Sequence, residues 1–165
     1  MSNTENGIIE IIDKGIELEL LLSDLYMAFS DYFKDDRDFW WRLSVEEKHH
    51  ASFLESGKEV LIPFDKFPTE ILPKSINELN HVCNQINKVI CYCNDKSISR
   101  EEAFNYAVYI EGSAGEAHYQ SALEKDIDSD VLRVFHVLNE GDKNHKQRIL
   151  AYMTEHGIKV NQDQQ

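Results

Sequence analysis

Two short stretches of this sequence place a histidine three residues after a carboxylate. Glu47 precedes His50 in the stretch EEKHH, and Asp142 precedes His145 in the stretch DKNH. Residues three apart on an α-helix lie on the same face, so each pair can offer an oxygen and an imidazole nitrogen to one metal ion. One such pair is weak evidence, since a single inward histidine is more often a core residue bonded to a carbonyl group.

Four long segments carry an apolar stripe at helical spacing, and a carboxylate interrupts each stripe near its middle. The polar residues at this depth are Glu19, Glu47, His50, Glu111, Asp142 and His145. Burying even one uncompensated carboxylate costs several kcal/mol, and four close together repel one another. Shared protons would neutralise two of them, whereas two divalent cations would neutralise all four and use both imidazoles.

The two halves of the chain resemble each other around these residues. Aligning 15–26 with 107–118, and 43–50 with 138–145, superimposes Glu19 on Glu111, Tyr26 on His118, Glu47 on Asp142 and His50 on His145. A carboxylate from each of two helices, with a carboxylate-x-x-His pair from each of two others, is a known helix-bundle arrangement for a dinuclear site. Oxygen and imidazole ligands without thiolate favour iron or manganese over zinc.

Long helices must position these residues. The predicted helices cover about 6–33, 37–60, 75–93, 99–125 and 130–156. Ser75 and Ser99 each begin a capping-box pattern, and Gly157 is typical of a helix end. The short turns pair the helices into two antiparallel hairpins, joined by a long crossover that contains the extra helix 75–93. We therefore expect a single all-α domain over 1–165.

Composition narrows the function classes. The chain carries 17 Lys and Arg against 30 Asp and Glu, a formal net charge of −13. This acidity argues against nucleic acid and against anionic membranes as partners, because both need clustered cations. The stretch MSNTENG has no signal-peptide pattern, and no apolar run reaches the length of a membrane span. These features predict a soluble, cytoplasmic protein.

Three cysteines, an odd number, give no disulfide framework. Cys83 and Cys93 fall on the apolar stripe of the extra helix, where they are expected to pack, whereas Cys91 lies off that stripe. Any further role of the three thiols stays open.

The sequence resembles the ferritin-like superfamily, and within it the rubrerythrin-type proteins. The residues that carry this resemblance are Glu19 with Tyr26, the Glu47/His50 pair, Glu111 and the stretch DKNH at 142–145. The resemblance covers nearly all of 6–156 and implies a ferritin-like four-helix bundle that binds two iron ions per chain, with manganese or zinc as alternatives. It further implies bridging carboxylates at Glu47 and Asp142, terminal carboxylates at Glu19 and Glu111, and one histidine for each metal, His50 and His145.

The sequence also departs from that family. Asp142 stands where the family has Glu, and its carboxylate reaches on the order of 1 Å less. A further family glutamate is replaced by Ala114, His118 replaces a tyrosine matched by Tyr26, and there is no rubredoxin domain. These departures put a rubrerythrin-style peroxidase cycle and full occupancy of the second metal position in question.

The resemblance implies a diiron oxidoreductase that reacts with peroxide or dioxygen, protects against oxidative stress and takes electrons from a separate donor protein, as a homodimer. No catalytic residue beyond the metal ligands is needed. Tyr26 is either a hydrogen-bond partner of a ligand or a core aromatic, and His118 is such a partner, an extra ligand or a core histidine. The alternatives are a ferroxidase or iron-handling protein, and a metal-free helical scaffold or sensor.

Overall fold

The described part of the chain is helical throughout. The computed structural model describes residues 3–69, 72, 75–112 and 145–161, and these contain no strand. The α-helices are α1 (Asn3–Tyr32), α2 (Arg37–Leu61), α3 (Ile76–Asn94), α4 (Arg100–Glu111) and α7 (His145–Glu155), with short 3-10 turns η1 (Lys34–Asp36) and η2 (Ile62–Phe64). No helix among the described residues is long and apolar enough to cross a membrane.

The predicted signals at the start of α4 and the end of α7 are confirmed, and the capping box predicted at the start of α3 forms only in part. Ser99 and Glu102 form a complete capping box at the start of α4, whereas at α3 only the Ser75 side chain accepts a bond, from the Glu78 amide. Gly157 follows α7 with φ of +65°, a left-handed conformation that glycine adopts without a Cβ clash. The predicted helices 99–125 and 130–156 are described only as far as Glu111 and from His145 onward.

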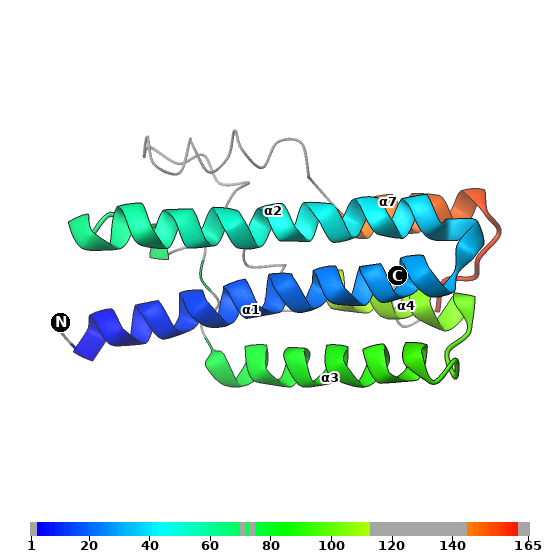
Figure 1. Cartoon of the computed structure of the whole chain (residues 1–165), viewed down its shortest axis with the longest axis horizontal. Helices are drawn as coiled ribbons and strands as arrows, with labels where there is room; N and C mark the ends of the chain where they lie inside the picture. The colour runs from blue at the N-terminus through cyan, green and yellow to red at the C-terminus, as the bar shows by residue number, and fades with distance from the viewer. Residues whose placement is uncertain (1–2, 70–71, 73–74, 113–144, 162–165) are drawn as a thin grey trace.

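The helices α1 and α2 form a long antiparallel hairpin, with α3 packed along α1 (Figure 1). The helices α4 and α7 contact each other and lie beside the end of that hairpin where it turns. The apolar stripes predicted for these helices are buried, including Leu22, Phe29, Leu43, Phe104 and Ile149. Cys83 and Cys93 are buried on α3 and Cys91 is exposed, as predicted.

A cluster of aromatic rings fills the core at this end of the hairpin. Trp40 is fully buried, with its ring centroid 5.0 Å from that of Phe29, 5.6 Å from Tyr26 and 4.3 Å from Phe104. These rings come from α1, α2 and α4, so their packing fixes the relative position of the three helices.

A buried carboxylate also ties the turn between α1 and α2 to the other two helices. Asp36, only 1% exposed, accepts two hydrogen bonds from Arg100 at the start of α4, at 2.6 and 2.7 Å. It accepts a third from the Tyr152 hydroxyl of α7, at 3.0 Å. This bidentate pair with a third donor neutralises the buried charge and holds α4 and α7 against the hairpin.

Candidate metal centre

Five of the six predicted ligand residues lie in the described structure, and all five side chains are buried together. Glu19 comes from the middle of α1, Glu47 and His50 come from the middle of α2, Glu111 ends α4 and His145 begins α7; each is at most 7% exposed. Two overlapping groups of these residues bring ligand atoms within 4.8 Å of one another: Glu19, Glu47 and His50, and Glu47, Glu111 and His145.

Glu47 is common to both groups, and its two oxygens face different histidines. Oε2 lies 3.0 Å from Nδ1 of His50, and Oε1 lies 2.7 Å from Nδ1 of His145. The two imidazole rings are stacked with centroids 5.3 Å apart. The carboxylate of Glu47 therefore stands between two nitrogen donors, as a carboxylate that bridges two ions would.

The remaining carboxylates complete the two groups from opposite sides. Glu19 Oε2 lies 3.6 Å from Nδ1 of His50, and Glu111 Oε1 lies 3.6 Å from Nδ1 of His145. The Nδ1 atom of each histidine thus faces the shared carboxylate and one further carboxylate. The alignment of the two halves pairs Glu19 with Glu111 and His50 with His145 in the same way, while its pairing of Glu47 with Asp142 lies partly outside the described residues.

The side chain of Tyr26 reaches the cluster from α1. Its hydroxyl donates a hydrogen bond to Oε1 of Glu111, and its ring stacks on Trp40. Both alternatives for this residue therefore hold, because Tyr26 is a core aromatic and the hydrogen-bond partner of a cluster carboxylate. Such a bond restrains the orientation of the carboxylate.

Glu46 contacts His145 at the edge of the cluster, a contact that the sequence does not predict. Its Oε2 lies 3.0 Å from Nε2 of His145, and Arg148 holds its carboxylate with hydrogen bonds of 2.5 and 3.1 Å. The helical pattern places Glu46 at the flank of the inward face, beside exposed Lys48 and His49. The signal that identifies it is the pairing with Arg148, one turn after His145, which sequence spacing alone does not show.

The electrostatics of the cluster follow from burial and from mutual contact. Burial raises the pKa of Glu19 from 4.5 to about 7. Burial also disfavours the charged form of Glu47, but its contacts with His145 and His50 outweigh this and lower its pKa. Burial works against both imidazolium ions, yet the surrounding carboxylates raise the pKa of His50 and His145 well above 6.5. The carboxylates and imidazoles therefore stabilise opposite charges in one another.

Each of the two groups could hold a metal ion. Among the described residues, Glu19 Oε2, Glu47 Oε1 and Glu111 Oε2 are buried without a hydrogen-bond partner. Two ligand atoms at right angles, each about 2.1 Å from a metal, lie about 3 Å apart, and the 2.7 and 3.0 Å separations around Glu47 match this spacing. Glu47 Oε1 lies close to Nδ1 of His145 but has no hydrogen-bond geometry with it. Two ligand atoms that point at a shared metal ion are expected to have this arrangement.

Two predicted site residues cannot be placed. Asp142 and His118 lie outside the described residues, as does Ala114. The predictions for Asp142 as a bridging ligand, and the three alternatives for His118, therefore stay predictions.

Comparisons of the chain with family models, with curated proteins and with solved structures give no match.

Proposed function

We propose that this protein is a dinuclear metal enzyme of the rubrerythrin type, in which two iron ions react with peroxide or dioxygen. One observation carries the proposal: the two oxygens of Glu47 face two different buried histidines, each with a further carboxylate at 3.6 Å. A core that needed only to be apolar would not place five ionisable side chains there, because burying them costs several kcal/mol unless they are neutralised.

The proposed fold is a ferritin-like four-helix bundle in which α1, α2, α4 and α7 each contribute a ligand. Glu19 and Glu111 would be terminal ligands, His50 and His145 would bind one ion each, and Glu47 would bridge, with Asp142 as the second bridge. Manganese offers the same preference for oxygen and imidazole ligands, and zinc is less favoured.

Two bound iron ions would supply Lewis acidity and electrons for the reaction with the oxidant. The chain's own residues prepare the site for it. The five cluster side chains are themselves at most 7% exposed, and Tyr26 and its stacked neighbour Trp40 are fully buried, which limits the access of bulk water. Tyr26 orients Glu111 through its hydroxyl, and the carboxylate of Glu46 lies 3.0 Å from Nε2 of His145, the ring nitrogen that does not face Glu47. Electrons would come from a separate donor protein.

The test is the iron content per chain after anaerobic loading with ferrous iron. We expect about two ions per wild-type chain, as the number of three-ligand groups indicates. Glu47→Gln should lose both ions, because its carboxylate belongs to both groups, while Glu19→Gln and Glu111→Gln should each weaken one position. Glu55→Gln, an exposed change on the same helix, should bind iron as the wild type does. Stopped-flow mixing of the loaded protein with peroxide or dioxygen then identifies the oxidant.

One observation favours a second candidate, a metal-free scaffold or sensor. The raised pKa values of His50, His145 and Glu19 allow two imidazolium ions and one neutral acid to balance the cluster with protons alone. In that case no iron would bind, and replacing Glu19 by Leu would stabilise the protein, because an apolar side chain removes the cost of burial. Iron binding that Glu47→Gln abolishes excludes this candidate.

A further inference from the structure

A pocket beside the turn between α1 and α2 concentrates positive charge on this acidic chain. Its volume is about 490 Å³, and its lining contains Lys34, Arg37, Arg42 and Arg148, with only two acids, Asp35 and Asp38. The chain as a whole has a net charge of −13. The pocket is therefore a local reversal of the overall charge.

Three of these cations have no partner of their own within the described part of the chain. Arg148 is held by Glu46, but no ion pair engages Lys34, Arg37 or Arg42 there, and all three are exposed. No described residue neutralises these three charges, and an anionic partner would complement them.

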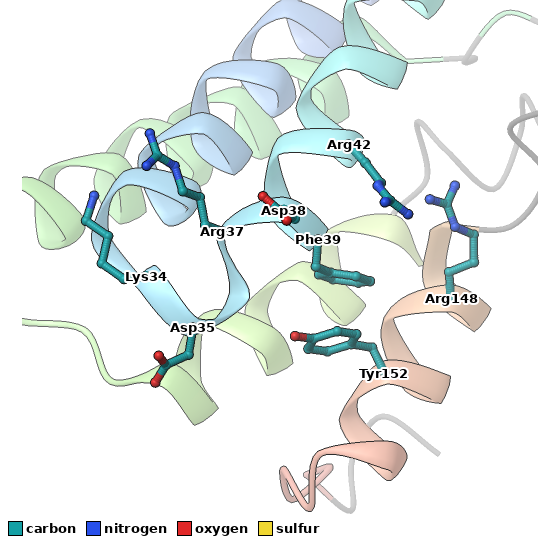
Figure 2. A pocket seen from close by; sticks show the side chains of 8 residues that line it. All are labelled: Lys34, Asp35, Arg37, Asp38, Phe39, Arg42, Arg148 and Tyr152. Carbon is teal, nitrogen blue, oxygen red and sulfur yellow. The ribbon is translucent and has the colours of Figure 1, made fainter.

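The arrangement of the side chains favours a broad partner over a small anion. Figure 2 shows Lys34 and Arg37 on one side of the pocket and Arg42 with Arg148 on the other, while the stacked rings of Phe39 and Tyr152 lie between them. The cations do not converge on one point, as a small phosphate or carboxylate would require. An aromatic centre inside a charged rim is instead the anatomy of a protein interface.

The pocket is joined to the buried cluster of carboxylates and histidines by rings in contact. Phe39, which lines the pocket, has its ring centroid 5.2 Å from that of Trp40, and Trp40 stacks on Tyr26 at 5.6 Å. The Tyr26 hydroxyl in turn donates to Glu111. Electron tunnelling weakens steeply across empty gaps, so a packed route of two ring contacts and one hydrogen bond couples this surface to the cluster.

We infer that this face is the docking surface for an acidic electron-transfer protein, an inference that rests on the proposed function. Carboxylates of the partner would meet the rim of Lys34, Arg37 and Arg42, and the rest of the acidic surface would repel other orientations. In each encounter the partner's redox group would lose one electron, and one ferric ion held by the cluster would become ferrous. Two encounters would return both iron ions to the ferrous state.

The test uses flavodoxin, an acidic protein that carries one flavin and donates single electrons, and measures its binding to the metal-free chain by calorimetry at low ionic strength. We expect binding that weakens with added salt, and affinity at least about tenfold lower in Arg37→Glu/Arg42→Glu, because like charges across an interface cost several kcal/mol. The control Lys66→Glu/Lys88→Glu makes the same change in net charge at exposed positions outside the pocket, and should change affinity by less than about twofold. Absence of binding, or equal loss in both variants, overturns the inference.

A second measurement separates this inference from the proposed function. With iron-loaded protein, reduced flavodoxin should reduce the ferric ions more slowly in Arg37→Glu/Arg42→Glu than in the wild type and the control, with unchanged iron content. If the chain takes up no iron, the proposed function fails while the binding result still stands. If iron is bound and the charge reversal affects neither binding nor reduction, the docking surface alone is refuted.

Discussion

Replacing Glu19 by Gln should stabilise the metal-free protein at alkaline pH while it weakens metal binding. Burial raises the pKa of Glu19 from 4.5 to about 7, so the folded protein retains a proton that the unfolded chain releases. The stabilisation from this proton is complete below the unfolded value and is lost as the pH rises through the folded value. At 1.36 kcal/mol per pKa unit, the loss amounts to about 3 kcal/mol by about pH 8.

Glutamine has the shape of the protonated acid and does not titrate. Wild type and Glu19→Gln should therefore have similar stability near pH 4.5, and the variant should be up to about 3 kcal/mol more stable near pH 8. The pKa of about 7 already includes the opposing contact of the ionised Glu19 with the imidazole of His50, at 3.6 Å. The sign of the difference is therefore the main expectation, and about 3 kcal/mol is its order of magnitude.

Urea unfolding in the presence of a chelator, followed by circular dichroism at several pH values, measures this difference. The control is Glu55→Gln, whose exposed carboxylate lies on α2 and should leave the pH dependence unchanged. Parallel stability curves for wild type and Glu19→Gln would refute the reasoning, because they would show that Glu19 is not buried as an acid with a raised pKa.

Three further changes test separate parts of the structure. Asp36→Asn should lower the free energy of unfolding by about 2 kcal/mol, since Arg100 loses its charged acceptor; an unchanged midpoint in urea would contradict this. Glu46→Gln should lower the metal affinity of one position about 10- to 100-fold with an unchanged number of ions at saturation, because Glu46 contacts Nε2 of His145, the ring nitrogen that does not face Glu47. Competition with a chelator measures this affinity. Ser99→Ala should cost about 1 kcal/mol by thermal unfolding through loss of the α4 cap, and a neutral result would assign that cap no role.

The periodic part of this fold could be predicted from the sequence. The stripes that contain Glu19 and Glu47 are buried as their spacing indicates, because a helix fixes which residues share a face. The same rule separates buried His50 from its exposed neighbour His49. Where helical geometry alone decides the position of a side chain, a count of residues in steps of three and four is enough to predict whether that side chain is buried.

Contacts between distant segments could not be predicted in this way. Asp36 bonds to Arg100 and Tyr152, which lie 64 and 116 residues further along the chain. Glu46 meets Arg148 across 102 residues. Each of these acids looks like an ordinary surface residue in its own helix, and its partner follows only from how the helices pack.

The position of Glu47 has a consequence for the order in which the protein is made. The first group consists of Glu19, Glu47 and His50, which lie on one hairpin within the first 50 residues. The second group is complete only after His145 has been synthesised. A nascent chain emerging from the ribosome thus presents one half of the centre long before the other. If the chain binds two ions as proposed, the residues of the first group meet once α1 and α2 pair, and those of the second group meet only once α7 packs beside them.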